Sequence, residues 1–446
     1  MIFRKCINNA AVLTVSFFFA ACHNSENLSY AETMEEEQIS SSSAETSLLA
    51  DFVQSPIIKT YPYAGIPRLV VETENLASVN DRETEIPAKM RFWRDSVPET
   101  DVMKMTIRGR GNFSWTMPQK SYKIEFADKQ SLLGMPKDKE WALIANYADK
   151  SLMKNYLMYR LSAKLNMFYS PRCEYVELFL NNEYLGVYLL TETIKKSKYR
   201  VNISQDENAY IVEFDQKYRD GEIIFFSDVI KSDENGMPFR IHEPKNPSTE
   251  TLDTLETYIR SFEELLKNVK LGESNGLEEW LDIDSYIKHY WLQEFPKNPD
   301  AVFYSSVYFA WTRGKTIKMG PIWDYDLSLG GHRREHIRQV EGWHVKYSYW
   351  NTYVFQDTLL ENARVLFWQE NKEKFLELLT EADSLYWVLE KAARNNFRRW
   401  NILKHIGVDY HFNAYETYRE TVEDLKKWIT ERYDWIESQM PKGTKS

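Results

Sequence analysis

The sequence of 446 residues has only three cysteines, and this scarcity limits its chemistry. Cys6 and Cys22 belong to an N-terminal segment with the features of a secretion signal, so Cys173 is the single cysteine expected in the folded part of the chain. One cysteine can form neither an intramolecular disulfide nor a cysteine-based zinc site. Cys173 comes just before the strand-like stretch YVELFL, and we expect its side chain to be buried.

The sequence also lacks an excess of basic residues. The 56 Lys and Arg residues are outnumbered by 66 Asp and Glu residues, which gives a formal net charge of -10. Because nucleic-acid phosphates are bound by a positive field, this balance argues against a nucleic-acid partner. The sequence also contains no GxSxG, HExxH or P-loop motif and no internal repeat.

Histidine is rare, with eight residues in the whole chain. Two of them, His332 and His336, lie four positions apart in GGHRREH, a spacing that suits a metal pair on a helix. No helix is assured so close to two glycines. The sequence therefore favours a surface loop or an anion-contacting loop over a metal pair.

The N-terminal apolar run, Ala10–Ala21, is too short to span a bilayer by itself. It follows Arg4 and Lys5 and ends in FAAC, where small residues precede Cys22. This pattern predicts a lipoprotein signal peptide over residues 1–21, with Cys22 as the lipid-modified first residue; an ordinary signal peptide or an uncleaved anchor is the alternative. A lipid on Cys22 would tether the protein to a membrane surface without spanning it. We therefore expect an exported lipoprotein at the outer membrane or cell surface of a Gram-negative bacterium.

Residues 22–55 are polar and acidic, with the stretch AETMEEEQISSSSAETS at their centre. Such a composition buries too little apolar surface to fold, so we predict a flexible tether. An acidic run soon after a lipidated cysteine also resembles the surface-export signals of some Gram-negative lipoproteins. The sequence leaves both interpretations open.

The first part of the folded chain, residues 56–192, is predicted to be rich in strands. The run Lys120–Phe126 alternates apolar and polar residues, as a half-buried strand does. Two further strands flank Asn181-Asn182, a residue pair typical of a tight hairpin turn. One helix is predicted from about Asp149.

The second part, residues 193–345, becomes helical from about Ser248, after the strand-like stretch AYIVEFD. Residues 346–446 are almost entirely helical and extend the same part of the chain. We therefore predict an α+β fold with a β-rich N-lobe, a helical C-lobe and a junction near residues 191–196. Enzymes that hold a nucleotide between two lobes have this plan, although fold alone does not establish function.

Two aspartates lie two positions apart in MGPIWDYDLSLGG, residues 319–331. Carboxylates this close repel each other, and the repulsion raises one pKa unless a cation offsets it. Asp324 and Asp326 are therefore a metal site, a pair that shares a proton, or two solvated turn residues. Asp300 precedes the strand-like runs VFYSSVYFAW and TIKMGPIW, which form a predicted hairpin that ends near Asp324. The two ends of one hairpin bring both carboxylates to the same cleft mouth.

Phosphoryl transfer needs one carboxylate to orient the attacking hydroxyl and another to hold a metal on the phosphates. Taken alone, Asp300 is more typical of a helix or turn cap. As a set with Asp324 and Asp326, the three aspartates favour the functional interpretation.

Basic candidates lie earlier in the chain, in IRGRGNFSW and on the strand that follows it. The glycines permit close backbone approach to a ligand, and Arg108 and Arg110 could neutralise phosphate, although a GxG stretch alone also suits a tight hairpin turn. Lys120 and Lys123 lie on the strand that follows this glycine-containing stretch. Kinases place a lysine in the same position, from which it reaches the phosphates. The two lysines lie on opposite faces, so at most one points into a cleft, and a solvated edge lysine is the alternative.

Five motifs in order resemble the CotH kinases, the family of spore-coat-protein-H-like atypical kinases, over roughly residues 66–345. They are RGRGNFSWTMPQKSYKIEF, SLLGMPKDKEWALIANYADKSLMKNYLMYRL, VELFLNNEYLGVYLLTE, NPDA and GPIWDYDLSLGG. The resemblance implies an atypical protein-kinase-like fold that binds ATP with a divalent metal and phosphorylates protein serines. It implies that Asp324 binds the metal, with Asp326 as a second ligand, and that Asp300 orients the substrate hydroxyl.

The same resemblance implies nucleotide-binding roles for five further residues. Arg108 and Arg110 match the arginine-glycine motif above the phosphates, Lys120 matches the strand lysine with Lys123 as second choice, and Glu192 lies near the lobe junction on the adenine side or in a structural role. The sequence departs from ordinary kinases in having no literal HRD or DFG. It also has serines, at 305 and 306, where they place a metal-binding asparagine.

The sequence thus predicts a lipid-anchored kinase that transfers the γ-phosphoryl group of ATP to a serine or threonine of a protein substrate, with Mg²⁺ or Mn²⁺. The alternative is a non-catalytic surface lipoprotein, an adhesin or glycan-associated protein that keeps the fold. The 15% aromatic content suits either glycan binding or a core packed with rings. Exposed aromatic rows would favour the adhesin, and an intact cleft with Asp300, Asp324 and a lysine would favour the enzyme.

Overall fold

The computed structural model describes residues 51–231, 234–407 and 410–441. The predicted signal peptide, Cys22 and the tether up to residue 50 lie outside the described residues. From Phe52 onward the chain forms one compact unit. Among the described residues, no helix combines the length and the apolar character that crossing a membrane requires.

The predicted tether ends earlier than residue 55. Residues 51–54 form the short helix η1 (Asp51–Gln54), which is followed by α2 (Pro56–Thr60). Phe52 is buried, and its ring lies 4.8 Å from the ring of Phe179 and 5.9 Å from that of Trp93. The ring of Phe52 thus packs this segment onto the barrel.

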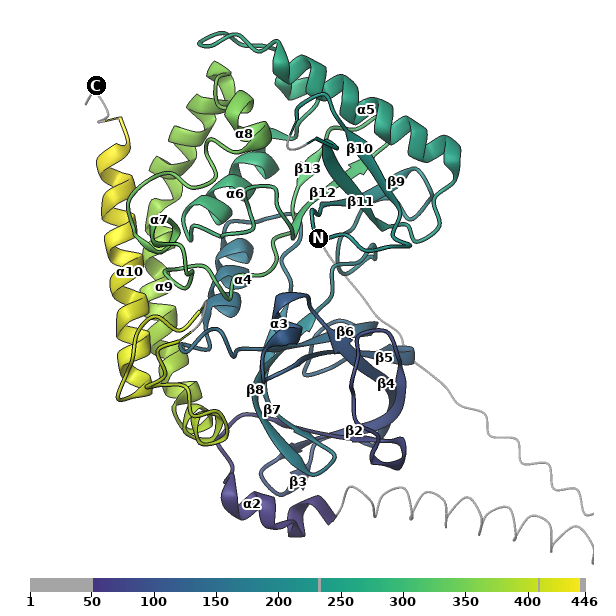
Figure 1. The fold of residues 1–446 in the computed structure, drawn as a ribbon, viewed down its shortest axis with the longest axis vertical. Coiled ribbons are helices and arrows are strands. Elements are labelled where there is room, and N and C mark those ends of the chain that lie inside the picture. Colours follow the sequence, from purple (N-terminus) through teal and green to yellow (C-terminus); the bar gives the residue numbers. More distant parts are fainter. Residues whose placement is uncertain (1–50, 232–233, 408–409, 442–446) are drawn as a thin grey trace, which may run out of the picture. The chain divides into compact units, whose positions relative to one another are not determined.

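Eight strands from the first half of the chain form one sheet, which closes into a barrel (Figure 1). Their order is β1-β7-β8-β6-β5-β4-β2-β3, and β1 also pairs with β2, so seven strands complete a ring. All pairings are antiparallel except that of β1 with β7. The strands are β1 (Arg68–Thr73), β2 (Ile86–Arg94), β3 (Val97–Pro98), β4 (Met103–Arg110), β5 (Ser121–Gln130), β6 (Asp138–Ala145), β7 (Cys173–Leu180) and β8 (Glu183–Glu192).

The alternation predicted for β5 is confirmed. Tyr122, Ile124 and Phe126 are buried in the hydrophobic cluster that the barrel strands share, whereas Lys123 and Glu125 are only half-buried on the other face. The hairpin of β7 and β8 is also confirmed. Asn181 and Asn182 both have positive φ angles, 50° and 63°, which is the backbone that a two-residue turn between twisted strands needs. Cys173 is buried, as expected.

A second, antiparallel sheet has the order β10-β11-β9-β12-β13. The part of the chain predicted to be a helical lobe therefore contains a sheet as well as helices. The first predicted strand of the hairpin begins only at Val307, because Phe303 and Ser306 have positive φ angles that an extended strand does not allow. The strands are β9 (Ala209–Phe214), β10 (Ile224–Ser227), β11 (Met237–Glu243), β12 (Val307–Thr312) and β13 (Lys318–Met319).

The helices complete a mixed α+β fold, as predicted. The helix expected from Asp149 begins at Lys154, and the Asp149 carboxylate accepts hydrogen bonds from the backbone of Ser151 and Lys154, each at 2.9 Å. The remaining elements are η2 (Glu74–Leu76), α3 (Phe113–Thr116), α4 (Lys154–Lys164), α5 (Thr249–Lys267), η3 (Leu277–Glu279), α6 (Ile283–Glu294), α7 (Glu335–Arg338), α8 (Tyr349–Val354), α9 (Thr358–Arg399) and α10 (Tyr418–Gln439).

The 42-residue helix α9 contacts both the barrel and the other helices. It packs on α4, α6 and α10, and its last turn reaches strand β8, where the Asn396 side chain accepts a hydrogen bond from the Val187 backbone at 2.9 Å. Gly186 is required at this contact, because a Cβ there would lie 2.5 Å from the Asn396 oxygen. Figure 1 shows α9 and α10 side by side along the barrel and the helices above it.

One fully buried ion pair joins α6 to α10. The Arg432 guanidinium donates to the Glu294 carboxylate at 2.7 Å and to the carbonyls of Phe295, Val340 and Gly342. Glu294 also accepts from the backbone N–H groups of residues 344, 345 and 346. The pair is therefore saturated with hydrogen bonds, which is the condition under which buried charges are tolerated.

We predict that Arg432→Met lowers the free energy of unfolding by about 3–5 kcal/mol, because it leaves the Glu294 charge buried without its partner. Chemical denaturation followed by tryptophan fluorescence measures this. The matched control is Arg394→Met, which removes an exposed pair with Glu390 on α9 and should cost less than about 1 kcal/mol. Equal effects of the two changes would contradict the importance given to the buried pair.

Candidate active site

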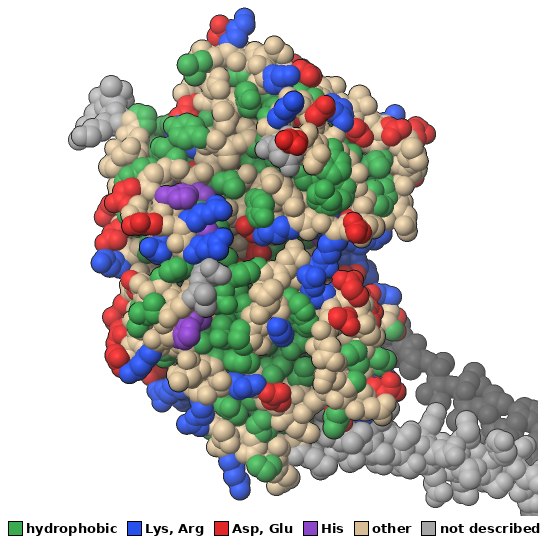
Figure 2. All heavy atoms as spheres, viewed as in Figure 1, with side chains coloured by type: hydrophobic (Ala, Val, Ile, Leu, Met, Phe, Trp, Pro, Cys, Tyr) green, Lys and Arg blue, Asp and Glu red, His purple; other side chains and the backbone are tan. Residues whose placement is uncertain are grey.

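A cavity of about 720 Å³ is lined by residues from the barrel and from the second sheet. The barrel contributes the end of β4 and the loop after it. Further parts of the lining come from β9 and the loop that follows, from the segment after α6, from Arg240 of β11 and Tyr308 of β12, and from the segment after β13. Figure 2 shows one face of the molecule, on which Lys and Arg side chains gather around its middle.

The three aspartates predicted from the sequence all line this cavity. Asp324 is exposed to the cavity, but protein surrounds the cavity on most sides. This desolvation, and then the nearby charge of Asp300, raise the pKa of Asp324, while Arg110 and Lys217 oppose the rise. Burial and the charge of Asp324 hold the pKa of Asp326 well above its usual value. The two carboxylates are therefore a strained pair that a cation would relieve.

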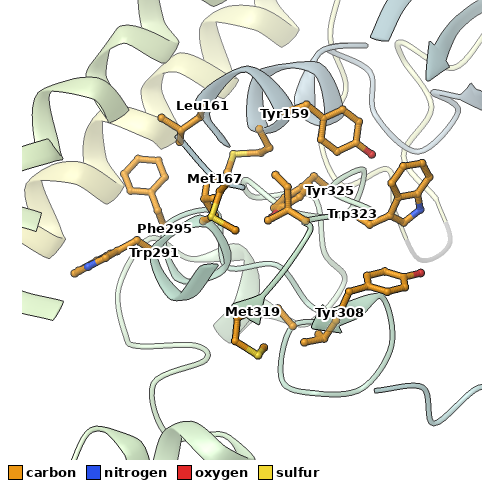
Figure 3. Packing of buried hydrophobic residues seen from close by; sticks show 14 of the residues in the cluster. Tyr159, Leu161, Met167, Trp291, Phe295, Tyr308, Met319, Trp323 and Tyr325 are labelled. Atoms are coloured by element: carbon orange, nitrogen blue, oxygen red, sulfur yellow. The ribbon is translucent and has the colours of Figure 1, made fainter. Parts of the chain in front are cut away.

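Aromatic packing fixes the backbone that carries these carboxylates. Trp323 and Tyr325 are buried, and the ring of Tyr159 from α4 stacks on Trp323 with centroids 5.8 Å apart (Figure 3). The Tyr325 N–H donates to the Asn155 side chain at 2.8 Å. Asp324 lies between Trp323 and Tyr325 in the sequence and has a φ of 66°. This is a left-handed backbone conformation that aspartate adopts more readily than most residues. The two rings are buried in the core, whereas the side chains of Asp324 and Asp326 line the cavity.

Asn298 connects the two aspartate segments, a role that the sequence did not reveal. Its side-chain oxygen accepts from the Asp300 N–H at 3.3 Å, and its amide donates to the Asp324 carbonyl at 3.2 Å. The same amide donates to Gln293 at 2.9 Å. Asn298 is itself buried, so this amide fixes the spacing of the two segments from inside the protein.

Asp300 forms an ion pair with Lys217, whose Nζ lies 3.1 Å from the carboxylate. Burial alone lowers the pKa of Lys217, but Asp300 and then Asp324 outweigh it and raise the pKa, so the lysine stays charged at neutral pH. Lys217 also lies over the ring of Tyr304, 4.7 Å from its centroid. Lys217 could not be identified from the sequence, since it lies in a loop without a motif.

Both predicted arginines line the cavity. The Arg110 guanidinium lies 5.1 Å from the ring centroid of Trp323 and is close enough to Asp324 for the two charges to interact. Burial lowers the pKa of Arg110, and Asp324 opposes this effect. Arg108 donates to the Arg82 carbonyl at 2.6 Å and lies 3.6 Å from Glu85. The barrel therefore places two guanidinium groups in the cavity that also holds the aspartates.

A family model described as CotH kinase protein matches residues 107–436, from β4 to the end of α10. The chain belongs to the CotH kinase family. The resemblance inferred from the five motifs is thereby confirmed, and membership indicates a kinase-like enzyme. A comparison with curated proteins found no match.

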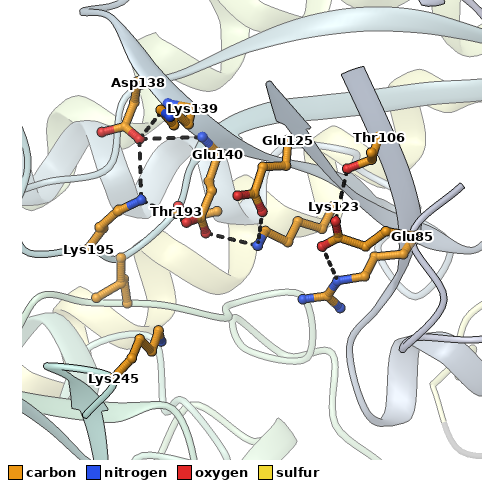
Figure 4. Close-up of polar contacts among 12 residues, drawn as sticks. Glu85, Thr106, Lys123, Glu125, Asp138, Lys139, Glu140, Thr193, Lys195 and Lys245 are labelled. Carbon is orange, nitrogen blue, oxygen red and sulfur yellow. Dashed lines mark hydrogen bonds and ion pairs between the residues drawn. The ribbon is translucent and has the colours of Figure 1, made fainter. Parts of the chain in front are cut away.

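Three residues that the sequence placed at the nucleotide do not line the cavity of this CotH kinase. Lys120 donates to the Trp115 carbonyl at 2.5 Å, and Lys123 pairs with Glu125 at 2.7 Å and Glu140 at 3.0 Å (Figure 4). Burial raises the pKa of Glu140, but Lys195 and Lys123 outweigh it and bring the pKa to about 2. Lys123 is therefore held by two carboxylates, and Lys120 by a backbone carbonyl.

Glu192 is also occupied. It is fully buried and accepts from Arg172 at 2.8 Å and from the Tyr169 hydroxyl at 3.2 Å. It lies outside the cavity lining, at the end of β8. Nucleotide binding by Lys120, Lys123 and Glu192 gains no support from their positions and stays a prediction.

A group of charged residues at the end of β9 was missed by the sequence analysis. Arg240 of β11 contacts Glu213, lies 3.1 Å from Asp215 and 3.2 Å from Glu222, and all four line the cavity. Asp215 also accepts from the Ser305 hydroxyl at 3.2 Å. One guanidinium group therefore serves three carboxylates, and it holds them together in the cavity wall. The stretch AYIVEFD predicts a strand, and this pattern alone does not indicate that Glu213 and Asp215 line a cavity.

The GGHRREH loop lines the cavity through its first half. His332 and the two arginines after it belong to the lining, whereas His336 does not. Burial, together with neighbouring arginines, lowers the pKa of His332 to about 4, so the ring is neutral at pH 7. The two histidines do not both line the cavity, and an anion-contacting role for this loop stays a prediction.

The carboxylates fit a divalent cation only in part. No three His, Cys, Asp or Glu side chains of the described residues converge as a complete metal-binding group. Mg²⁺, however, is commonly held by one or two carboxylates together with phosphate oxygens of the substrate. Asp324 and Asp326 are two strained carboxylates of the required kind, so they fit a metal that arrives with a nucleotide.

We predict that Asp326→Asn stabilises the protein without metal at pH 8. Because burial and the charge of Asp324 raise the pKa of Asp326 on folding, the ionised carboxylate opposes folding, and stability falls as pH rises above the pKa of the unfolded chain. The gain should shrink as pH approaches about 4, where the unfolded carboxyl also protonates. Melting temperatures in EDTA measure it, and for a unit of this size about 1 kcal/mol would shift them by roughly 1 °C.

Mg²⁺ with a nucleotide should reverse this order, because it stabilises the parent protein and not Asp326→Asn. The control is Asp253→Asn, on the exposed side of α5, which should change neither result. A variant that is less stable than the parent at pH 8 in EDTA would show that the carboxylates are not a strained pair.

Proposed function

We propose that this CotH kinase transfers the γ-phosphoryl group of ATP to a serine or threonine hydroxyl of a protein, with Mg²⁺ or Mn²⁺. The observation that carries the proposal is the convergence of Asp300 and Asp324 in one cavity with Lys217 and Arg110 beside them. Phosphoryl transfer requires little covalent chemistry from the protein, so positioned carboxylates and cations are the main requirement.

The aspartates have separate roles in this proposal. Asp300 accepts a hydrogen bond from the acceptor hydroxyl and takes its proton, and Lys217 holds the Asp300 carboxylate in place. Asp324 and Asp326 hold the divalent cation, which when bound neutralises charge on the phosphates. Arg108 and Arg110 are suited to contact the phosphate groups from the barrel side.

The proposal includes a kinase-like two-lobed arrangement. The barrel would correspond to the N-lobe, and the second sheet with the later helices to the C-lobe. In support, Arg110 reaches the cavity from the barrel and Asp300 reaches it from the segment after α6. The barrel differs from an open N-lobe sheet in being closed by the pairing of β1 with β2.

The alternative of an adhesin or glycan-binding protein finds less support. A glycan-binding face is expected to present aromatic side chains in a row. Among the described residues, the exposed aromatic side chains come from separate segments, namely Phe113, Tyr199, Tyr218, Tyr304, Tyr347 and Trp387.

We predict that Asp300→Asn lowers kcat for phosphoryl transfer by about 10²–10⁴-fold, the usual effect of losing a general base, while ATP still stabilises the protein. Asp324→Asn should instead abolish the stabilisation by ATP and metal, which in the parent amounts to about 2.7 kcal/mol at a ligand concentration of 100 Kd. Incorporation of labelled phosphate and thermal shift measure the two effects. Asp253→Asn is the matched control. No thermal shift in the parent protein would favour the adhesin.

Lipid anchoring at the bacterial envelope remains part of the proposal and rests on the signal pattern that ends at Cys22. We predict that Cys22→Ser moves the protein expressed in a Gram-negative host from the membrane fraction to the soluble fraction, because the lipidated thiol is lost. Fractionation followed by immunoblotting measures this. Retention of the variant in the membrane would instead indicate an uncleaved anchor.

A further inference from the structure

One side chain packed against the Asp324 segment has a polar atom that the fold leaves unused. Tyr159, in the middle of α4, is only 1% exposed. Its hydroxyl oxygen is buried and has no hydrogen-bond partner among the described residues. The large majority of buried hydroxyl groups are hydrogen-bonded, because burial takes them away from water. The Tyr159 hydroxyl therefore requires an explanation that its ring packing does not give.

The ring of Tyr159 contacts the residues on both sides of Asp324. It stacks on Trp323 with centroids 5.8 Å apart and meets Tyr325 edge-on with centroids 6.5 Å apart (Figure 3). One turn earlier on α4, the Asn155 side chain accepts the Tyr325 N–H at 2.8 Å. Helix α4 is thus fixed against the backbone on either side of Asp324.

The hydroxyl of Tyr159 is a hydrogen-bond donor at all pH values at which the protein works. Burial and then the charge of Asp324 raise the pKa of Tyr159 well above its usual value, although Arg110 opposes the rise. A phenol that keeps its proton can donate to a carboxylate, and such a charge-assisted hydrogen bond is strong. Asp324 is exposed to the cavity, so its carboxylate can turn without displacing a packed side chain.

We propose that Tyr159 is a positioning residue, whose hydroxyl donates a hydrogen bond to the Asp324 carboxylate when a divalent cation is bound in the cavity. The inference rests on the proposed function, which assigns Asp324 to the metal. Carboxylates that bind metals are in turn hydrogen-bonded by neighbouring groups, and these partners orient them. A bond from Tyr159 to one oxygen would leave the other oxygen for the cation.

The ring and the hydroxyl of Tyr159 can be tested separately. Tyr159→Phe keeps the ring that packs on Trp323 and Tyr325 and removes only the oxygen. The matched control is Tyr290→Phe on α6. Tyr290 is also 1% exposed, its hydroxyl also lacks a partner within the described part of the chain, and it does not line the cavity. Each variant therefore loses one buried, unpaired hydroxyl, and only Tyr159 is packed against Asp324.

We expect both variants to melt in EDTA at or above the parental temperature, because an unpaired buried hydroxyl contributes no hydrogen bond to the folded state. With Mn²⁺ and ATP as the probe, Tyr159→Phe should bind about 10–100-fold more weakly than the parent, the usual effect of removing a hydrogen-bond partner of a metal ligand. Tyr290→Phe should bind as the parent does. Isothermal titration calorimetry measures the affinities, and thermal unfolding in EDTA measures the stabilities.

A steady-state measurement adds a readout that packing alone would not change. The Mn²⁺ concentration that gives half the maximal rate of phosphate transfer should rise for Tyr159→Phe by about the same 10–100-fold. At saturating Mn²⁺ its kcat should change less, because the defect lies in holding the cation. The corresponding values for Tyr290→Phe should stay at those of the parent.

Failure of this inference is distinct from failure of the proposed function. If Mn²⁺ and ATP neither bind nor stabilise the parent and no phosphate is transferred, the proposed function is wrong, and the role of Tyr159 falls with it. If the parent binds Mn²⁺ and ATP, an equal affinity of Tyr159→Phe overturns the positioning role alone. An equal loss in Tyr290→Phe does so too, because the effect is then not specific to Asp324. A lower melting temperature of Tyr159→Phe in EDTA would also overturn it, since the hydroxyl would then stabilise the fold itself.

Discussion

The buried pair of Glu294 and Arg432 is the interaction on which the candidate site most depends. Glu294 is the last residue of α6, four positions before Asn298, and its carboxylate accepts three backbone N–H groups from the segment that precedes α8. Arg432, on α10, donates a hydrogen bond to the same carboxylate. Removing two charges from water is costly, and the cost is offset here only because nearly every hydrogen-bonding group of the pair finds a partner. The loop that carries Asn298 and Asp300 therefore begins from a fixed point.

From that point the structure positions the aspartates by stepwise contacts. Asn298 spaces the Asp300 segment from the Asp324 segment, and the rings of Trp323 and Tyr325 fix the backbone around Asp324. The left-handed conformation of Asp324 and the raised pKa of its carboxyl are both unfavourable in isolation. Packing elsewhere in the protein stabilises an arrangement that only a cation or a proton can relax, a property expected of a site that works by electrostatics.

Much of the local structure could be predicted from the sequence, because it depends on neighbours along the chain. The alternation of β5 and the turn at Asn181-Asn182 follow from residue type and spacing. The predicted hairpin between Asp300 and Asp324 was the reason to expect both carboxylates in one cavity, although its first strand is shorter than predicted. The closure of the barrel was not predictable, since it requires the distant pairings of β1 with β2 and β7. The positions of the lysines depended on such partners too: Lys123 is taken up by Glu140, from another strand.

The long helix α9 has a mechanical consequence. At about 1.5 Å per residue its 42 residues extend over roughly 60 Å, and it contacts the barrel at one end and α6 along its length. Because one rod contacts both strand β8 of the barrel and helix α6, it limits how far the barrel can move relative to the later helices. On the proposed function, nucleotide and acceptor would enter a cavity whose width changes little. Binding in such a preformed site requires little ordering of the protein, so more of the contact energy appears as affinity.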